Sequence, residues 1–486
     1  MDQHACEILP RAELEPCTII IFGGSGDLTS RKLIPALLTL FNSGQLPEHF
    51  SIIGCSRTRM TDRQYREHLQ RSGSAGRSAE ELQGWQAFSR HLHYFPLEYN
   101  PAGFARLAAH LRRQSGSRQP SANLLFELAV PPRLYPLIGE LLGQAGLADQ
   151  TRGWSRLVVE KPFGHDLATA RSLNTTLHQF FQEEQLFRID HYLAKETIQN
   201  LLIFRFANAI FEPIWNRRYI DSVQIMAAEQ LGVGTRAGFY EQAGVIRDMF
   251  QNHLMQLLVL TAMEPPYCLE AEAVHDEKIK VIRSLRTFSA ERGSAIRLGQ
   301  YSPGIIAGSR VPGYREEAGV APHSTTPTYA RLTTYVDNWR WQGVPFFLVS
   351  GKRLPRKQTR ITIQFKAVPH SLFSDSLGDG IRANTLTIET YPEEAIRLSF
   401  QTKNPSPQLC LRTMEMDFAY HEHYPGPAPD AYGRVLLDCM LGDQLLFWRQ
   451  DGIEASWAFL EPVLEACADC GGLQQLHFYP AGSEGP

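Results

Sequence analysis

The feature that most constrains the fold of this chain is a glycine loop that directly follows an apolar run near the N-terminus. The run Thr18–Phe22 has the composition of a buried strand, and Gly23-Gly24-Ser25-Gly26-Asp27-Leu28 leads from it into a helical pattern. Glycines let the backbone approach a pyrophosphate closely, and the next helix offers free N–H groups and the positive end of its dipole. The loop therefore predicts a dinucleotide-binding turn in a parallel α/β sheet.

The glycine pattern is incomplete, so the loop alone is also compatible with a plain glycine turn. If Gly24 and Gly26 are the first two small positions, the third falls on Thr29. Pro35 must either lie in the first turn of the following helix or kink that helix, and the sequence does not decide between these.

The order of expected elements differs between the two parts of the chain. The first part alternates strands and a helix, which predicts a Rossmann-like, doubly wound parallel sheet, with strands at 18–22, 51–54, 124–130 and 157–159 and a helix at 33–41. The second part mixes long helical stretches with alternating strands, which predicts an α+β domain with a mostly antiparallel sheet and helices on one face, from helices at 191–211 and 242–263 and strands at 222–227, 331–336 and 360–365. We expect the two domains to span residues 1–190 and 191–486.

Composition excludes several classes of protein. A chain of 486 residues is too long for one compact core, and its net charge of -3 provides no general attraction for nucleic acid or anionic lipid. The first residues lack a secretory signal, and no apolar stretch is long enough to span a membrane. The eight cysteines are scattered, and Cys467 and Cys470 lack a second pair at zinc-ribbon spacing, so we expect free thiols, no metal site and a cytoplasmic location.

The residues after the second expected strand indicate which dinucleotide is bound. Ser56-Arg57-Thr58-Arg59 stands where an acidic residue would bond the ribose 2′-hydroxyl of NAD, and no carboxylate precedes Asp62. A guanidinium group matches a 2′-phosphate in a bidentate manner, so Arg57 favours NADP. The alternative is that both arginines are solvated surface residues.

A short segment after residue 187 combines acidic, basic and aromatic residues. Phe187-Arg188-Ile189 is expected to end a strand, and Asp190 to Glu196 to begin a long helix. At helical spacing His191 and Lys195 share a face, in the first turns where a helix already favours an anion. This predicts a phosphate site. In the alternative, Asp190 is a simple N-cap and the two basic residues lie on the surface.

Two further segments carry polar residues in positions suited to chemistry. Gly244 to Leu254 places Asp248 and His253 within an apolar helix, where His253 is either a hydrogen-bonded core histidine or a general base placed by a carboxylate. An ordinary imidazole, with a pKa of about 6.5, can accept a hydroxyl proton at physiological pH. Lys161 follows an expected strand and precedes a helix, so it faces the ligand crevice of an open α/β sheet or lies in a plain turn.

Together these segments resemble the glucose-6-phosphate dehydrogenase family, of the bacterial type, from about residue 18 to the end of the chain. The motifs that carry the resemblance follow one another in the expected order: Gly23 to Leu28 with Arg31-Lys32, Glu160-Lys161-Pro162-Phe163-Gly164, Arg188 to Glu196, Arg247 to His253, Asp276-Glu277-Lys278, Val311-Pro312-Gly313-Tyr314, Asn338-Trp339-Arg340-Trp341 and Gly351 to Lys357. The nonapeptide Arg188–Glu196 is the most specific of them.

The resemblance implies oxidation of D-glucose 6-phosphate at C1 to 6-phospho-D-glucono-1,5-lactone, the first oxidative step of the pentose phosphate pathway. The hydride would pass to C4 of the nicotinamide of NADP, with NAD as a secondary cofactor. The resemblance also implies a homodimer or homotetramer built through the sheet of the second domain, which would bind substrate and mediate oligomerisation.

The resemblance assigns a role to each candidate residue. His253 would be the general base, and Asp190 the carboxylate that orients it. The phosphate would be bound by His191, Tyr192, Lys195 and Lys357, and the sugar hydroxyls by Glu229, Asp248 and Lys352. The dinucleotide would contact Gly23, Gly24, Ser25, Gly26, Asp27, Leu28, Arg57, Glu98 and Tyr99, with Lys161 between substrate and cofactor.

The chain departs from the family pattern at three positions. Ala194 replaces a usual glycine, with little effect expected because alanine also suits a helix. Glu127 stands where an aromatic residue is common, and a carboxylate there could alter the nicotinamide contacts. Glu484 stands where tryptophan is typical, and the structural cofactor site of animal members is not carried over.

Two other hypotheses compete with the active enzyme. A catalytically silent relative would have lost the base or the phosphate-binding residues, but Asp190, His191, Lys195, Asp248 and His253 are all present. An enzyme acting on unphosphorylated glucose would not need the pair His191 and Lys195. An enzyme that uses NAD is opposed less strongly, because an arginine such as Arg57 can also stack on adenine.

Overall fold

The computed structural model of the chain describes residues 14–73, 84–115, 122–190, 192–193, 195–289, 295–370, 381–405, 407, 410–423, 431–469 and 476–486. The chain divides into two compact units. The first comprises Met1–Gly164, Ala168–Ala194 and Ala428–Gln450, and the second comprises His165–Leu167, Lys195–Pro427 and Asp451–Pro486. Among the described residues, no helix is both long and apolar enough to cross a membrane.

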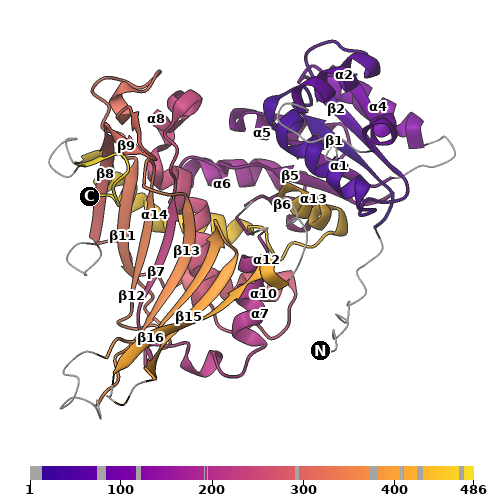
Figure 1. Cartoon of the computed structure of the whole chain (residues 1–486). Coiled ribbons are helices and arrows are strands. Elements are labelled where there is room, and N and C mark those ends of the chain that lie inside the picture. Colours follow the sequence, from indigo (N-terminus) through magenta and orange to yellow (C-terminus); the bar gives the residue numbers. More distant parts are fainter. Residues whose placement is uncertain are drawn as a thin grey trace. The chain divides into compact units, whose positions relative to one another are not determined.

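The first unit is built on a six-stranded sheet in the order β3-β2-β1-β4-β5-β6 (Figure 1). Every neighbouring pair is parallel. The strands are β1 (Cys17–Phe22), β2 (Phe50–Ser56), β3 (Leu92–Pro96), β4 (Leu124–Leu128), β5 (Ser155–Val159) and β6 (Leu186–Arg188). The strand order reverses between β1 and β4, and ligands of such sheets bind outside the carboxyl ends of the strands at this point.

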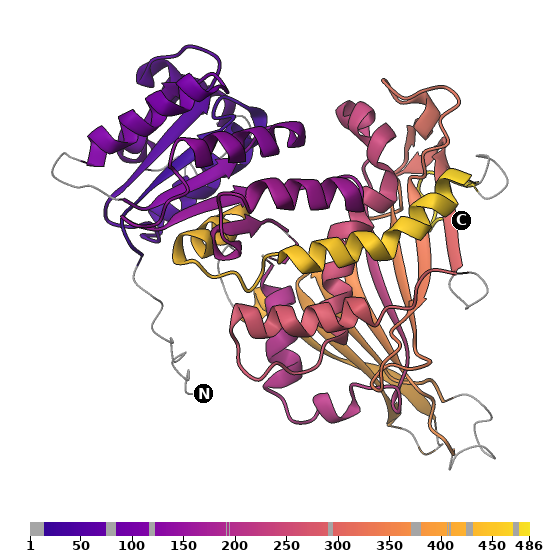
Figure 2. The ribbon, with the colours of Figure 1, turned by 180° about the vertical axis from the view of Figure 1, so that it is seen from behind.

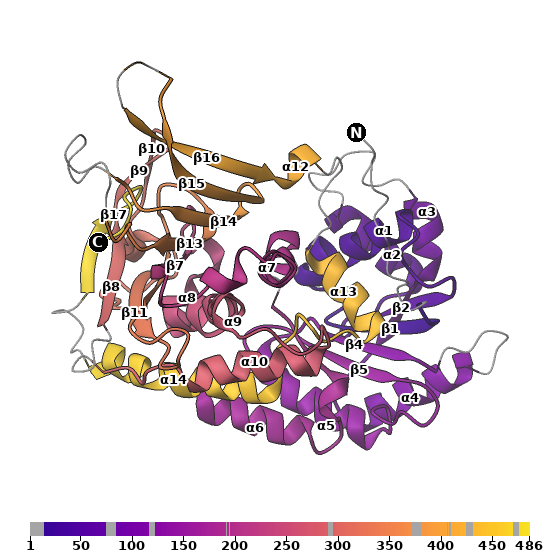
Figure 3. The same cartoon turned by 90° about the horizontal axis from the view of Figure 1, so that it is seen from below.

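Helices cover both faces of this parallel sheet (Figure 3). One face carries α1 (Ile34–Asn42), α2 (Asp62–Gly73) and α13 (Ala431–Leu441), and the other carries α4 (Pro101–Ser115), α5 (Tyr135–Gln144) and α6 (Leu167–Leu177). Every residue of β1 is buried, as expected of a strand that is covered on both faces. Helix α13 belongs to this unit although it lies near the C-terminus, and no sequence pattern indicated that position.

The second unit contains a nine-stranded sheet in the order β16-β15-β14-β13-β7-β12-β11-β8-β17. Two pairs, β12 with β7 and β17 with β8, are parallel and the others are antiparallel. The strands are β7 (Ile220–Ala228), β8 (Ala295–Ser302), β11 (Tyr329–Tyr335), β12 (Pro345–Gly351), β13 (Gln358–Phe365), β14 (Thr385–Tyr391), β15 (Ala395–Lys403), β16 (Leu411–Ala419) and β17 (Leu476–Pro480). The prediction of a mostly antiparallel sheet is confirmed.

Helices lie on one face of this sheet and leave the other face uncovered, as the two opposite views show (Figures 1 and 2). The helices are α7 (Glu196–Phe206), α8 (Ala237–Val245), α9 (Met255–Ala262), α10 (Ala271–Arg283) and α14 (Gln450–Asp469). The helical stretch predicted at 242–263 is interrupted at Gly244 (φ 57, ψ -180), which is not helical. After this kink the chain is helical through the π-helical segment Ile246–Leu254 to the end of α9 at Ala262.

The helix predicted to begin at Asp190 begins later, and this prediction is wrong. One carboxylate oxygen of Asp190, Oδ1, accepts a hydrogen bond from the backbone N–H of Tyr192 at 2.9 Å, and Leu193 N–H donates to Asp190 O at 3.1 Å. These bonds form a turn that competes with helix formation. Lys195 is extended (φ -78, ψ 136) and acts as the N-cap of α7, so it cannot share a helix face with His191.

Helix α7 also ends earlier than predicted, at Phe206 and not at residue 211. In the first unit, Pro35 lies near the start of α1, directly after a π-helical turn at Thr29–Leu33. The helix runs from this wider turn into α1, which accommodates a residue without an N–H group. Because the helical run already begins at Asp27, Pro35 lies inside the helix and not in its first turn, directly after the π-helical widening.

Candidate active site

The glycine loop after β1 lies against the neighbouring strand β2 and the segment after β4. Gly23 has a positive φ of 81°, and a Cβ atom there would lie 2.1 Å from Ala129 O. A Cβ atom on Gly24 would lie 2.5 Å from the Cα atom of Gly54. Both N–H groups donate to Cys55 O, at 2.8 and 3.1 Å. Only glycine fits at these two positions, and the fit holds the loop at the carboxyl edge of the sheet.

Thr29 occupies the third small position of the loop. It has no exposed surface, and its hydroxyl donates to Gly23 O at 3.0 Å. Ser25 lies on the other side, with its hydroxyl 2.9 Å from that of Ser56 at the end of β2. These side chains tie the loop to both flanking elements, and the departure from a third glycine is compatible with a tight turn.

Tyr99 and Arg57, two residues predicted to contact the cofactor, lie near this loop. The Tyr99 phenol interacts with the backbone of Gly23 and with the charge of Arg57. Burial raises the pKa of Tyr99 to about 12, and the Arg57 charge opposes that rise. Arg57 itself is exposed at the carboxyl end of β2. A cation in that position is available to a ligand that lies across the loop.

The remaining residues predicted to contact the cofactor are closer to solvent. Asp27 is exposed and forms an ion pair with Arg31 at 2.8 Å, and Leu28 is half-buried. Glu98 is exposed and accepts a hydrogen bond from Asn100 at 3.2 Å. Lys161 is half-buried in the turn after β5.

Arg188 of the nonapeptide has a structural role within the first unit. It is 2% exposed and pairs with Glu183 at 2.7 Å, while it also donates to Asn174 and to Trp448 O. These bonds hold the end of β6, after which the chain reaches the buried Asp190. Tyr192 is half-buried, and His191 lies outside the described residues.

Two lysines of the second unit meet on one aromatic ring. The Nζ atoms of Lys195 and Lys357 lie 5.3 and 4.1 Å from the ring centroid of Tyr391, and Lys195 also donates to Thr390 O at 3.0 Å. Burial and, to a smaller extent, the charge of Lys357 together lower the pKa of Lys195 to about 8, while the charge of Glu394 opposes the shift. We call Lys195, Lys357 and Tyr391 the lysine pair site.

The low pKa of Lys195 shows that this arrangement destabilises the unliganded fold. An unfolded lysine keeps its proton up to a pH of about 10.4. Between a pH of about 8 and that value the unfolded chain binds more protons, so stability rises as the pH rises through this range. Two neighbouring positive charges that lower the stability of the unliganded fold are typical of a site for an anionic ligand.

Glu229, Lys352 and Asp248 form a second cluster in the same unit. Glu229 follows β7 and Lys352 follows β12, and the register of these parallel strands pairs Ala228 with Gly351, so the next residues lie side by side. The Lys352 ammonium group forms an ion pair with Glu229, and its Nζ lies 3.9 Å from Asp248 Oδ2. The cluster offers one donor and two acceptors, which suits the recognition of neighbouring hydroxyl groups.

His253 lies on the π-helical segment together with Asp248. Both are buried, with 2% and 5% of their surface exposed. In a π-helix, residues five apart lie about one turn from each other, and such turns are frequent at functional sites. The hydroxyl of Ser456 anchors this segment by donating to Gln251 O at 2.8 Å. Asp190 belongs to the first unit and His253 to the second, so their pairing stays a prediction.

Sequence reasoning missed two aromatic residues that contact the predicted lysines. Tyr391 carries the lysine pair site, and Tyr240 places its ring 4.9 Å from Lys352 Nζ with 2% of its surface exposed. Neither residue is close in sequence to its lysine. No local pattern could therefore have identified these contacts.

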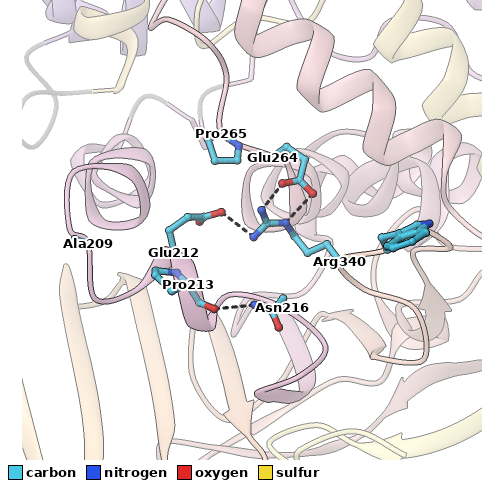
Figure 4. Close-up of a pocket in the computed structure, with 8 residues that line it drawn as sticks. Ala209, Glu212, Pro213, Asn216, Glu264, Pro265 and Arg340 are labelled. Atoms are coloured by element: carbon cyan, nitrogen blue, oxygen red, sulfur yellow. Dashed lines mark hydrogen bonds and ion pairs between the residues drawn. The ribbon is translucent and has the colours of Figure 1, made fainter.

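A pocket on the second unit lies outside these clusters (Figure 4). Ala209, Glu212, Pro213, Asn216, Glu264, Pro265, Trp339 and Arg340 line it. Arg340, the one basic residue of that lining, is neutralised by ion pairs with Glu264 and with Glu212. The pocket includes none of the predicted site residues.

The first unit is a doubly wound sheet with a glycine loop at its first turn, and the second is an α+β unit that carries basic clusters. This combination defines a dinucleotide-dependent oxidoreductase. Residues 20–200 match the family model "Glucose-6-phosphate dehydrogenase, NAD binding domain", and residues 202–486 match "Glucose-6-phosphate dehydrogenase, C-terminal domain". The chain belongs to the glucose-6-phosphate dehydrogenase family.

Individual relatives agree with this assignment over nearly the whole chain. Glucose-6-phosphate 1-dehydrogenase of Aggregatibacter actinomycetemcomitans is 44% identical over 479 residues, which cover 97% of this chain and 94% of the relative. The enzyme of Chlamydia pneumoniae is 41% identical, with coverage of 97% and 93%. A solved structure of glucose-6-phosphate dehydrogenase in complex with its substrate glucose-6-phosphate superposes with a TM-score of 0.89, at 33% identity and coverage of 99% and 97%.

Proposed function

We propose that the chain oxidises D-glucose 6-phosphate at C1 to 6-phospho-D-glucono-1,5-lactone, the first oxidative step of the pentose phosphate pathway. Its membership of the family and its similarity to a substrate complex support this function. The lysine pair site is the main observation that favours a phosphorylated sugar as substrate, because the ammonium groups of Lys195 and Lys357 both lie against the Tyr391 ring.

The proton and the hydride leave the sugar in one step. The C1 hydroxyl proton passes to Nε2 or Nδ1 of His253, the C1–H bond breaks, and a C1=O bond forms. Asp190 would orient the imidazole and stabilise its charged form. The burial of His253 on a helix that also carries Asp248 supports its role as a fixed base.

The phosphate would be bound by Lys195 and Lys357, with His191 and Tyr192 completing the site. A dianionic phosphate between the two lysines removes the repulsion that lowers the pKa of Lys195. The sugar hydroxyls would be bound by Glu229, Asp248 and Lys352, whose ion pairs keep their side chains in place. Lys161, in the turn after β5, would lie between the sugar and the cofactor.

The dinucleotide would bind at the loop Gly23 to Leu28, and we propose NADP as the preferred cofactor with NAD as a secondary one. When bound, it accepts the hydride at C4 of its nicotinamide. The tight approach of Gly23 and Gly24 to their neighbours supports this site, as does the position of the loop at the start of a helix, where N–H groups favour an anion. Arg57 would bind the 2′-phosphate, and Glu98 and Tyr99 would contact the dinucleotide. We also propose a cytoplasmic location for the enzyme.

The function is tested by comparing kcat/KM for glucose 6-phosphate and glucose, each with NADP and with NAD, from the absorbance of the reduced nicotinamide. We expect the phosphorylated sugar to be preferred by at least about tenfold, because each charge-assisted hydrogen bond contributes about 1.5–3 kcal/mol. Equal values for glucose and its phosphate would reject the phosphate site.

The cofactor preference has a matched variant in the same experiment. Arg57→Ser should reduce kcat/KM with NADP by about tenfold or more and leave the value with NAD nearly unchanged, because NAD lacks the 2′-phosphate that the guanidinium group binds. An equal loss of kcat/KM with both cofactors would mean that Arg57 contacts a chemical group that NADP and NAD have in common.

We further propose that residues 191–486, apart from the segment Ala428–Gln450 that belongs to the first unit, form the substrate-binding and oligomerisation domain, and that the chain is a homodimer or homotetramer. Strand β16 is the edge strand of the sheet, and Met414 and Met416 on it are 42% and 61% exposed. An uncovered sheet edge with exposed apolar side chains is an unfavourable surface for a monomer. Light scattering on the purified protein should give a mass of two or four chains, and a mass of one chain would contradict the proposal.

A further inference from the structure

Glu127 is a buried carboxylic acid that the proposed reaction does not use. It lies in β4 with no exposed surface, and its oxygens have no hydrogen-bond partner. Its side chain is buried in the interior of the first unit. The expectation that a carboxylate at this position alters the nicotinamide contacts stays a prediction.

Glu160 lies close to Glu127 in the first unit. The register of β4 and β5 pairs Glu127 with Val158, and Glu160 follows Val158 by two residues. Glu160 lies one residue beyond the end of β5, and its charge acts on Glu127, so the two carboxyl groups are near each other at the carboxyl ends of adjacent strands. The Oε1 atom of Glu160 is also buried without a hydrogen-bond partner.

Among the described residues, no cation forms a hydrogen bond with Glu127. Arg156, two residues before Val158 on β5, donates instead to Cys439 O at 2.8 Å and to Met440 O at 2.5 Å. The charge of Glu127 is felt by Tyr135 on α5 and by Cys439 on α13, and neither is a cation. Asp438 on α13 is already paired with Arg434 at 3.0 Å. Glu160 interacts with the hydroxyl of Tyr432 and with the backbone N–H and charge of Lys161.

Two ionised carboxylates cannot remain side by side in such a site, because burial and mutual repulsion both penalise the second charge. Burial raises the pKa of Glu127 well above its usual range, and the neighbouring charge of Glu160 raises it further. Burial also raises the pKa of Glu160 to about 7, while Tyr432 and Lys161 oppose that rise. The two groups therefore titrate as one pair.

We propose that Glu127 and Glu160 share one proton, and that this hydrogen-bonded pair positions the turn that carries Lys161. The Glu127 O–H donates to Glu160 Oε1. This hydrogen bond provides a partner for Glu160 Oε1 and for the protonated oxygen of Glu127, which otherwise have none. Glu160 in turn holds the N–H of Lys161 and the hydroxyl of Tyr432, so α13 and the turn after β5 are linked. Glu127 is thus a positioning residue for Lys161, and this role rests on the proposed function.

The shared proton makes the turn sensitive to alkaline pH. When the proton is lost to water, two negative charges face each other in the interior, and Glu160 is pushed away from Lys161. The folded chain binds this proton at pH values where the unfolded chain, with a glutamate pKa of about 4.3, has already lost it. Stability attributable to the pair therefore decreases as the pH rises above that value, until the folded pair has lost its proton as well.

The test uses Glu127→Gln, which keeps a donor for Glu160 but cannot ionise, and Glu127→Leu, which keeps the volume but has no donor. In infrared difference spectra at neutral pH, wild type minus Glu127→Gln should show the carbonyl band of a protonated carboxyl group. The thermal midpoint of Glu127→Gln should depend less on pH than that of the wild type. Glu127→Leu should lower kcat/KM for NADP by about three- to tenfold, the effect of one neutral hydrogen bond, without lowering the thermal midpoint.

Glu317→Gln is the matched control for the thermal measurement. Glu317 is a buried carboxylate that does have donors, namely Gly234 N–H at 2.7 Å, the Tyr301 hydroxyl at 2.7 Å and Arg353 at 3.3 Å. Its replacement should lower the thermal midpoint at neutral pH and should not make it less sensitive to alkali. The comparison of the two variants distinguishes a buried carboxyl group without hydrogen-bond donors, Glu127, from one with donors, Glu317.

Three outcomes would overturn the proposal. The first is the absence of a protonated-carboxyl band at neutral pH in the wild type. If the variants do not fold, the band can be followed in the wild type alone by recording its infrared spectrum as a function of pH. The second is an equal pH dependence of the thermal midpoint in Glu127→Gln and wild type. The third is full activity of Glu127→Leu, which would remove the link to Lys161. The spectroscopic and thermal measurements do not require turnover, so they remain decisive if glucose 6-phosphate is not oxidised.

Discussion

His253→Asn is expected to lower kcat for glucose 6-phosphate by about 10²–10⁴-fold while the dissociation constant for the sugar stays nearly unchanged. Proton transfer by a positioned base contributes a factor of this size, and asparagine keeps the approximate volume and polarity of histidine without its basicity. His253 is 2% exposed, so no bulk water replaces it as a base in the folded protein. Steady-state kinetics and calorimetric titration of the sugar measure the two quantities separately.

His275→Asn provides the matched control. His275 lies on α10 in the same unit and is 5% exposed, but it is not part of the proposed machinery. If loss of a buried imidazole only loosened the fold, both variants would lose thermal stability and turnover in parallel. A selective loss of turnover in His253→Asn identifies the base, and undiminished turnover in that variant would reject the assignment.

Lys195→Met is expected to reduce kcat/KM for glucose 6-phosphate by about 10–100-fold, mainly through KM, and to leave the low activity with glucose unchanged. The expected size is that of a hydrogen bond to a charged group, about 1.5–3 kcal/mol. Methionine keeps the length of the side chain beside Tyr391 and removes only the charge. A loss of the same size with both sugars would show that Lys195 supports the fold and does not bind phosphate.

Lys195→Arg tests the pH dependence of the same site. The pKa of Lys195 is lowered to about 8 by burial and by Lys357, so the free wild-type enzyme loses this charge as the pH rises through that value. Phosphate binding requires the charged form, and kcat/KM for glucose 6-phosphate should therefore fall above a pH of about 8. Arginine stays protonated, so this alkaline loss should be smaller in Lys195→Arg than in the wild type.

Much of the fold could be predicted because local patterns decide it. The buried run at Thr18–Phe22, the glycines after it and the alternation of strands and helices identify a doubly wound sheet, and β1 and β2 occur where expected. Longer alternating runs identified β7, β11 and β13 in the second unit. In each case the hydrophobic period of a short segment matches the face that becomes buried.

The start of α7 could not be predicted from periodicity, because it depends on a hydrogen bond. The hydrophobic pattern continues through residues 191–195, but the Asp190 side chain bonds the N–H of Tyr192 and forms a turn instead. The prediction that His191 and Lys195 share a helix face is therefore wrong. In the structure, Lys195 is brought together with Lys357 by the ring of Tyr391, which lies in another strand.

The sequence by itself thus determined the class of fold, the dinucleotide loop, and which acidic, basic and histidine side chains are available for chemistry. Only the tertiary structure decided which of them meet. Lys352 reaches Glu229 because β7 and β12 run parallel, α13 covers the first sheet from far along the chain, and Glu127 is buried close to Glu160. Strand register and long-range packing arise from the sum of many weak contacts between distant segments, and no short pattern of residues encodes that sum.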